Sequence, residues 1–154
     1  MIHYVKGDLV ENKYEPETYG IFCHQVNCCK AMGAGIAKQI RKKYPEVYKA
    51  YEDREYPYLG LVDWVPTYDG RICVNMYAQQ DYGTGSRRTN YIAFAQCLVE
   101  LAEYLTPVSK DTIVAFPYGI GCGLGGGDWK VISALIEDFE KMIEQDVYIV
   151  KKDN

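Results

Sequence analysis

The chain has 154 residues, a length that fits one domain, and we expect residues 1–154 to form a single domain. Hydrophobic residues make up 48% and aromatic residues 14% of the sequence, which excludes intrinsic disorder. The formal net charge of −4 excludes a chain-wide basic surface for a nucleic-acid backbone. No apolar run approaches the ~20 residues of a spanning helix, so we expect a soluble protein with no membrane partner.

Strand and helix patterns alternate from the first residues onward. The run Ile2–Lys6 predicts a strand and lacks the basic-then-apolar profile of a secretory signal, so we expect a cytoplasmic protein. Tyr19–Val26 predicts a second strand. A helical pattern covers about Gly33–Tyr44, where Pro45 interrupts it, and a further turn or helix is predicted over residues 47–51.

A hairpin is predicted next, from strands Leu61–Val65 and Ile72–Tyr77 joined by the turn signal Asp69-Gly70. A loop is predicted over Gly83–Arg88. Apolar residues then recur at helical spacing over Tyr91–Leu105, which predicts an amphipathic helix ending before a proline.

The last third of the chain repeats the alternation. Thr112–Phe116 predicts a buried strand, a second apolar helical stripe runs from Ile132 to Ile143, and Val147–Val150 predicts the last strand. Buried strands that alternate with amphipathic helices indicate the α/β class. The expected fold is a three-layer α/β/α arrangement with a central mixed β-sheet, in which the hairpin supplies the antiparallel pair.

The six cysteines do not have the spacing of a disulfide framework, and we expect reduced thiols packed as small apolar side chains. A zinc site built from Cys23, His24, Cys28 and Cys29 is an alternative. It lacks a C-x₂-C pair and a second paired cluster downstream, so we expect no bound metal and no cofactor.

A glycine-rich loop covers residues 118–127, in which six of the chain's 14 glycines fall, and Asp128-Trp129 and a helix follow it. A strand, such a loop and a helix N-terminus together present free N–H groups to an anion such as a phosphate. The alternative is a merely flexible loop.

Residues 24–35 form a second loop of this kind, with Gly33 and Gly35 before a helix. Two such loops at strand ends favour a diphosphate held by backbone donors. A Rossmann dinucleotide site is rejected, because the next strand ends near Val150 and Asp153 comes too late for the acidic ribose partner. A Walker A loop is rejected because Asp128 follows the glycines instead of Gly-Lys-Ser/Thr.

Three stretches carry a family resemblance: Val5-Lys6-Gly7-Asp8-Leu9, then Cys23-His24-Gln25-Val26-Asn27 leading into Met32-Gly33-Ala34-Gly35-Ile36-Ala37, and Gly119-Ile120-Gly121-Cys122-Gly123-Leu124. In order and spacing, the chain resembles the macrodomain family from residue 2 to about 150. Within it, the chain looks closest to the branch of the terminal ADP-ribose–protein glycohydrolase and the yeast ADP-ribose-1″-phosphate phosphatase.

The resemblance implies a site for ADP-ribose. Asp8 would accept a hydrogen bond from the adenine amino group near the Leu9 N–H, and Tyr148 is a candidate for adenine stacking. Asn27 would contact distal-ribose hydroxyls. Backbone donors to the phosphates and the distal ribose would come from Gly33, Ala34, Gly35 and Ile36, and from Gly119, Ile120, Gly121, Cys122, Gly123, Leu124 and Gly125. The alternatives are a turn aspartate at Asp8, an ordinary tyrosine at Tyr148 and a loop cap at Asn27.

The resemblance is weaker for the catalytic residues. The glycohydrolase of this branch is thought to use a lysine and an aspartate, and the corresponding positions here are Gln79 or Gln80 and Gly125, which cannot form a Schiff base or act as a general base. The remaining catalytic candidates are His24, which can titrate near neutral pH, and Asp128. The alternatives are a buried histidine and a helix N-cap.

The leading hypothesis is an enzyme that acts at the distal ribose of ADP-ribose derivatives. Its substrate would be ADP-ribose-1″-phosphate or, second, an ADP-ribosylated protein or nucleic acid. A non-catalytic module that binds ADP-ribose is the alternative. A nicotinamide-dinucleotide enzyme is a third hypothesis, and it lacks the acidic ribose partner.

Overall fold

The computed structural model describes residues 1–16, 20–82 and 85–152. Tyr19, Gly83 and Asp153, which were named in the sequence predictions, lie outside these ranges. The described residues form one six-stranded sheet in the order β1-β6-β5-β2-β4-β3. The strands are β1 (Ile2–Lys6), β2 (Ile21–Asn27), β3 (Val62–Pro66), β4 (Ile72–Gln79), β5 (Val114–Pro117) and β6 (Val147–Lys151).

The sheet is mixed, as predicted. The pairs β1·β6, β6·β5, β5·β2 and β2·β4 are parallel, and β3 pairs antiparallel with β4. The turn between β3 and β4 contains Gly70 with a φ of 86°, a left-handed conformation that glycine adopts without steric cost. The hairpin signal at Asp69-Gly70 therefore marked the antiparallel edge of the sheet.

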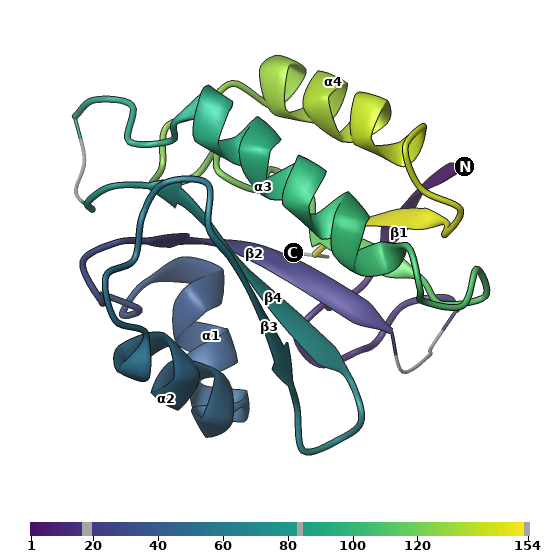
Figure 1. Ribbon diagram of the computed structural model, residues 1–154, viewed down its shortest axis with the longest axis horizontal. Helices are drawn as coiled ribbons and strands as arrows, with labels where there is room; N and C mark the ends of the chain where they lie inside the picture. Colours follow the sequence, from purple (N-terminus) through teal and green to yellow (C-terminus); the bar gives the residue numbers. More distant parts are fainter. Residues whose placement is uncertain (17–19, 83–84, 153–154) are drawn as a thin grey trace.

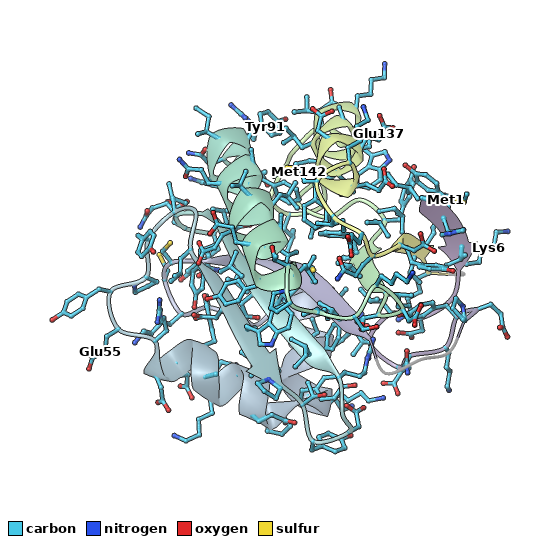
Figure 2. All side chains as sticks on the ribbon, turned by 45° about the vertical axis from the view of Figure 1, so that its right-hand side comes forward. Met1, Lys6, Glu55, Tyr91, Glu137 and Met142 are labelled. Carbon is cyan, nitrogen blue, oxygen red and sulfur yellow. The ribbon has the colours of Figure 1, made fainter. Side chains whose placement is uncertain are left out.

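In the described part of the chain, four helices cover the two faces of the sheet: α1 (Gly35–Lys43), α2 (Pro45–Asp53), α3 (Tyr91–Leu105) and α4 (Trp129–Glu140). The helices α1 and α2 lie on one face, and α3 and α4 lie on the other (Figure 1). Figure 2 labels Tyr91 at the start of α3 and Glu137 on α4, the two helices of the second face. The expected three layers are confirmed.

The local sequence explains where the helices begin and end. Asn90 accepts a hydrogen bond from the Ala93 N–H and caps α3, and Pro45 opens α2, where its missing N–H costs nothing. The helix α1 begins at Gly35 rather than at Gly33, because Ala34 has extended backbone angles (φ −141°, ψ 157°). The second stripe was predicted too long: α4 ends at Glu140, and Met142 is 54% exposed.

The strand β2 is buried along almost its whole length, which suits the apolar run of residues 21–23 at its start, although His24, Gln25 and Asn27 are polar. Its residues alternate between two core clusters, with Ile21 and Cys23 packed under α3 and α4 and Phe22 and Val26 packed against α1 and α2. None of the helices built from described residues is long and apolar enough to cross a membrane.

Candidate functional site

The five strands that run parallel end at the same edge of the sheet, and a cavity of about 690 Å³ lies along that edge. Ligands bind at this edge in open α/β sheets. The loops after β1, β2, β4, β5 and β6 all contribute to its lining: Gly7, Asp8, Leu9, Val10, Gln25, Val26, Asn27, Ala31, Gly33, Ala34, Gly35, Ile36, Ala37, Gln39, Gln79, Tyr82, Pro117, Tyr118, Gly119, Ile120, Gly121, Gly123, Leu124, Gly125, Val150 and Lys152.

The N-terminus of α1 opens onto this cavity. The first N–H groups of a helix have no partner within the helix, and the N-cap residue Ala34 supplies no side-chain cap. A Cβ added at Gly33 or Gly35 would meet nothing within 4 Å, and Gly35 has a φ of 59°. The backbone is therefore open to a close ligand, and the positive end of the helix dipole favours an anion there.

The glycine-rich loop after β5 forms the opposite wall. Gly119 and Gly123 also have open space where a Cβ would stand, whereas Gly121 and Gly125 are packed tightly. A Cβ at Gly121 would lie 2.9 Å from Gln25 Oε1, and one at Gly125 would lie 2.5 Å from Thr89 Oγ1. The loop is therefore packed from beneath and open toward the cavity, which contradicts the flexible-loop alternative.

Three side chains support the glycine-rich loop from below. Gln25 Nε2 donates to Gln79 Oε1 at 2.7 Å and to Thr89 Oγ1 at 2.9 Å, and the Thr89 hydroxyl donates to the Gly121 carbonyl at 2.6 Å. Gln25 Oε1 is buried and has no partner among the described residues. The sequence analysis assigned no role to Gln25 or Thr89, although the position of Gln25 near the carboxyl end of a predicted strand was a usable signal.

Asp8 and Leu9 lie together at one end of the cavity, as the resemblance implied. Asp8 Oδ1 accepts from the Glu11 N–H at 3.1 Å, and Oδ2 lies 3.6 Å from Lys152 Nζ. Lys152, which the sequence analysis did not single out, also lies 3.5 Å from Gln39 Oε1 on α1. The Asp8 side chain is about one-quarter exposed, and each carboxylate oxygen has one partner, the Glu11 N–H or Lys152, so a further donor can still be accepted.

Asn27 lines the cavity, but its amide is engaged in the loop that follows β2. Its Oδ1 accepts from the Cys29 N–H at 2.9 Å and from the Tyr51 hydroxyl at 2.7 Å, and Nδ2 donates to the Ala31 carbonyl at 2.8 Å. The loop-cap alternative for Asn27 therefore describes its contacts in this structure.

His24 does not line the cavity. Its side chain is fully buried, and Nε2 lies 2.5 Å from Asn75 Oδ1 on the neighbouring strand β4. Burial lowers the pKa of His24 to about 4, although the hydrogen bond to Asn75 acts in the opposite direction. The ring is therefore neutral at pH 7 and has no contact with the cavity, and we remove it from the catalytic candidates.

Three more predicted residues lie away from the cavity lining. Asp128 caps α4 by accepting from the Lys130 N–H at 2.9 Å, which is the N-cap alternative. Cys122 turns its thiol back to the Ile120 carbonyl. Tyr148 pairs with His3 in the register of β1 and β6 and stacks on its ring at 4.5 Å, well before the carboxyl end of β6. A role for Tyr148 in adenine stacking does not fit this position.

The residues of the zinc alternative do not converge. Cys23 and His24 are consecutive on β2, so their side chains point to opposite faces of the sheet. The described residues contain no group of three or more His, Cys, Asp or Glu side chains arranged to hold a metal ion. The six cysteines are free.

Comparisons with known proteins give the same answer as the motifs. No protein-family model matches the chain. An ADP-ribose 1″-phosphate phosphatase from Scheffersomyces stipitis is 38% identical over 182 residues, which cover 97% of this chain and 100% of that protein. A DNA ADP-ribosyl glycohydrolase from Mycobacterium tuberculosis is 28% identical over 155 residues that cover 97% of this chain, but the chain spans only 42% of that relative's length.

Among solved structures, the macrodomain of Mycobacterium tuberculosis DarG has a TM-score of 0.79 and 26% identity, and the superposition covers 100% of this chain and 99% of that one. The likeness in sequence and the likeness in structure both extend over nearly the whole chain. They confirm the family predicted from the three motifs: the chain belongs to the macrodomain family.

Proposed function

We propose that the chain binds ADP-ribose in the cavity at the carboxyl edge of the sheet and hydrolyses an ADP-ribose derivative at the distal ribose. One observation carries this proposal. The cavity is bounded by two strand-to-helix loops whose backbone is open to the ligand, at Gly33 and Gly35 on one side and at Gly119 and Gly123 on the other. Backbone donors on two walls suit a diphosphate between two nucleoside-like ends.

The geometry supports a direction for the ligand. Asp8 and the Leu9 N–H would take the adenine, and the N-terminus of α1 would take the diphosphate. The distal ribose would then lie between Asn27 and the loop Gly121–Gly125. The relatives support chemistry at that distal end, because one is named for removing a 1″-phosphate and another for removing ADP-ribose from DNA.

For the first substrate, hydrolysis would transfer the phosphoryl group of ADP-ribose-1″-phosphate to water and release ADP-ribose and inorganic phosphate. The N–H groups of the glycine-rich loop would stabilise the negative charge that develops on the phosphoryl oxygens. The second substrate class is an ADP-ribosylated protein or nucleic acid, in which water would displace the attached group from the distal ribose.

The six free cysteines support a reducing setting such as the cytoplasm.

A second candidate is a module that binds ADP-ribose without turnover, and one observation favours it. His24 and Asp128 lie away from the cavity, and near the glycine-rich loop the lining side chains are amides, alkyl groups and the phenols of Tyr82 and Tyr118, among the residues that the structure describes. An amide exchanges no proton near neutral pH, and no carboxylate, imidazole or amine lines this part of the cavity among the described residues. A proton-transfer group for fast catalysis is therefore not evident.

Calorimetry with ADP-ribose tests the binding half of the proposal. ADP-ribose at 100 times its Kd is expected to stabilise the fold by about 2.7 kcal/mol, and NAD is expected to bind much more weakly. No heat of binding and no thermal shift at millimolar ADP-ribose would refute it. Phosphate release from ADP-ribose-1″-phosphate and release of ADP-ribose from a modified oligonucleotide test the catalytic half. Tight binding of ADP-ribose with neither substrate consumed would establish the second candidate.

A further inference from the structure

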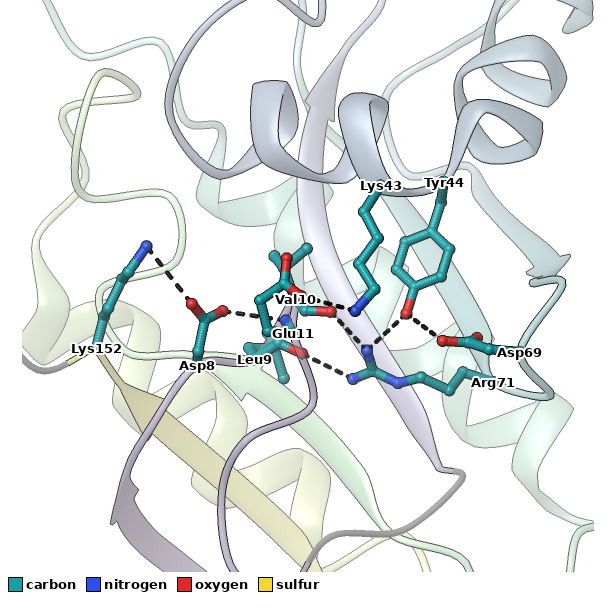
Figure 3. Close-up of polar contacts among 9 residues, drawn as sticks. All are labelled: Asp8, Leu9, Val10, Glu11, Lys43, Tyr44, Asp69, Arg71 and Lys152. Atoms are coloured by element: carbon teal, nitrogen blue, oxygen red, sulfur yellow. Dashed lines mark hydrogen bonds and ion pairs between the residues drawn. The ribbon is translucent and has the colours of Figure 1, made fainter.

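A buried arginine outside the cavity lies behind the loop that carries Asp8. Arg71 stands in the turn before β4 and is 1% exposed. Its Nη2 donates to the Leu9 carbonyl at 2.8 Å, and its Nη1 donates to the Val10 carbonyl at 3.0 Å (Figure 3). These contacts join segments 61 and 62 residues apart in sequence.

The surroundings of Arg71 compensate for taking its charge out of water, which is costly for an unpaired ion. The guanidinium carbon lies 4.0 Å from the centroid of the Phe22 ring. Nη1 also donates to the Tyr44 hydroxyl at 3.1 Å, and that hydroxyl in turn donates to Asp69 Oδ2 at 2.7 Å. The cation is therefore connected to a carboxylate through Tyr44, as Figure 3 shows.

The loop that Arg71 holds is the one that forms the Asp8 end of the cavity. Asp8 and Lys13 exchange two backbone hydrogen bonds at 2.9 Å, which close the loop at its base. Between them, Leu9 and Val10 line the cavity while their carbonyls point to Arg71. The planar guanidinium group of Arg71 binds two consecutive carbonyls, so it fixes the orientation of the two peptide planes that contain them. The peptide plane between Asp8 and Leu9, which carries the Leu9 N–H, directly precedes these two in the chain.

We propose that Arg71 is a positioning residue for recognition of the purine, acting from behind the loop without touching the ligand. It holds Leu9 and Val10 so that the Asp8 carboxylate and the Leu9 N–H face the cavity together. This inference rests on the proposed function. It adds a residue that determines how strongly the site prefers a purine with an amino group.

The test compares ADP-ribose with inosine diphosphate ribose, in which a carbonyl replaces the adenine amino group. The parent protein is expected to prefer ADP-ribose by about tenfold or more, since the partly buried Asp8 carboxylate loses its donor in the analogue. Arg71→Lys retains the charge but offers a point donor instead of a fork, and its preference is expected to fall to within about twofold. Tyr44→Phe, which removes one acceptor of Arg71 and the link to Asp69, is expected to give an intermediate preference.

A matched control separates positioning from stability. Phe139 lies on α4 and belongs to the core cluster on the α3–α4 face of the sheet, away from Arg71. Phe139→Leu is expected to lower the melting temperature while leaving the preference for ADP-ribose unchanged. In the double variant Asp8→Asn/Arg71→Lys, the preference is expected to equal that of Asp8→Asn alone. Both changes act on the same hydrogen bond, the one between the adenine amino group and the Asp8 carboxylate, so their effects do not add.

Amide hydrogen exchange without ligand gives a second readout. In Arg71→Lys the Asp8 and Lys13 amides are expected to exchange at least about tenfold faster than in Phe139→Leu compared at equal global stability. If the parent protein binds neither nucleotide, the proposed function fails, and the exchange rates still decide whether Arg71 holds the loop. An unchanged preference together with unchanged exchange in Arg71→Lys and Tyr44→Phe would overturn the inference.

Discussion

The two ends of the cavity are built in different ways. The Asp8 end uses a charged side chain, and a buried guanidinium holds its loop from behind. The end near Gly121 and Gly123 uses bare backbone, and the Gln25 and Thr89 side chains support it from beneath. A fixed carboxylate selects one arrangement of donors, whereas a row of N–H groups accepts any anion of suitable size. Selectivity is therefore expected at the first end and tolerance of different attached groups at the second.

The largest expected effect comes from filling the backbone end. Gly123→Glu places a carboxylate in open space that faces the cavity, where it would occupy the site of an anion and repel it. Affinity for ADP-ribose is expected to fall at least about 1,000-fold, or roughly 4 kcal/mol. Calorimetry checks this, with Gly123→Ala as the matched control, because a methyl group there meets nothing within 4 Å. A folded Gly123→Glu protein that binds like the parent would remove this loop from the site.

A pH effect on stability is expected from His24, which lies on β2, next to the strand β5 that leads into the glycine-rich loop. Its pKa in the folded protein is about 4, below the ordinary value of 6.5, so the unfolded chain binds the proton more readily. Stability from this group is present above about pH 6.5 and is lost as the pH falls toward 4. The full difference corresponds to about 3 kcal/mol.

Urea unfolding at pH 7.0 and pH 4.5 measures this loss. His24→Gln removes the titrating ring, so its free energy of unfolding is expected to fall less between the two pH values, whatever its absolute stability. Equal losses in the parent and in His24→Gln would show that His24 does not cause the acid sensitivity.

The Asp8 end is expected to respond to a smaller change. Asp8→Ala removes the acceptor for the adenine amino group and also the acceptor for the Glu11 N–H. Affinity for ADP-ribose is expected to fall by roughly 1–3 kcal/mol, measured by calorimetry. Asp53→Ala, at an exposed position on α2, serves as the control. Affinity unchanged in Asp8→Ala would mean that this carboxylate does not read the ligand.

The features that the sequence predicts are local ones, and the features that it does not predict depend on contacts between distant segments. Glycine density, helical periodicity and the Asp69-Gly70 turn are local signals, and they located the loops, the helices and the mixed sheet. The direction of a side chain depends on strand register: His24 pairs with Asn75, and Tyr148 pairs with His3, so neither reaches the cavity. Arg71 carries no local signal at all, because its partners Leu9 and Val10 lie some 60 residues earlier.

The smallest expected effect tests whether the backbone end contains a reactive side chain. Gln79 is one of the two positions, with Gln80, that correspond to the lysine thought to act in the resembling glycohydrolase. Its amide oxygen accepts a hydrogen bond from Gln25, and its amide nitrogen donates to the Asp81 carbonyl at 2.8 Å. The side chain of Gln79 therefore has a structural role in the cavity lining.

An amide exchanges no proton near neutral pH, so Gln79→Ala is expected to change single-turnover hydrolysis of ADP-ribose-1″-phosphate by no more than about threefold. Affinity for ADP-ribose, measured by calorimetry, is expected to stay within the same range. Thr89→Val removes the hydroxyl that binds the Gly121 carbonyl and is expected to have the larger effect of the two, because it loosens the loop itself. A 100-fold loss of turnover in Gln79→Ala with affinity retained would show that this amide contacts the reacting atoms. The backbone end would then carry the chemistry through a side chain, and the contrast between the two ends would be wrong.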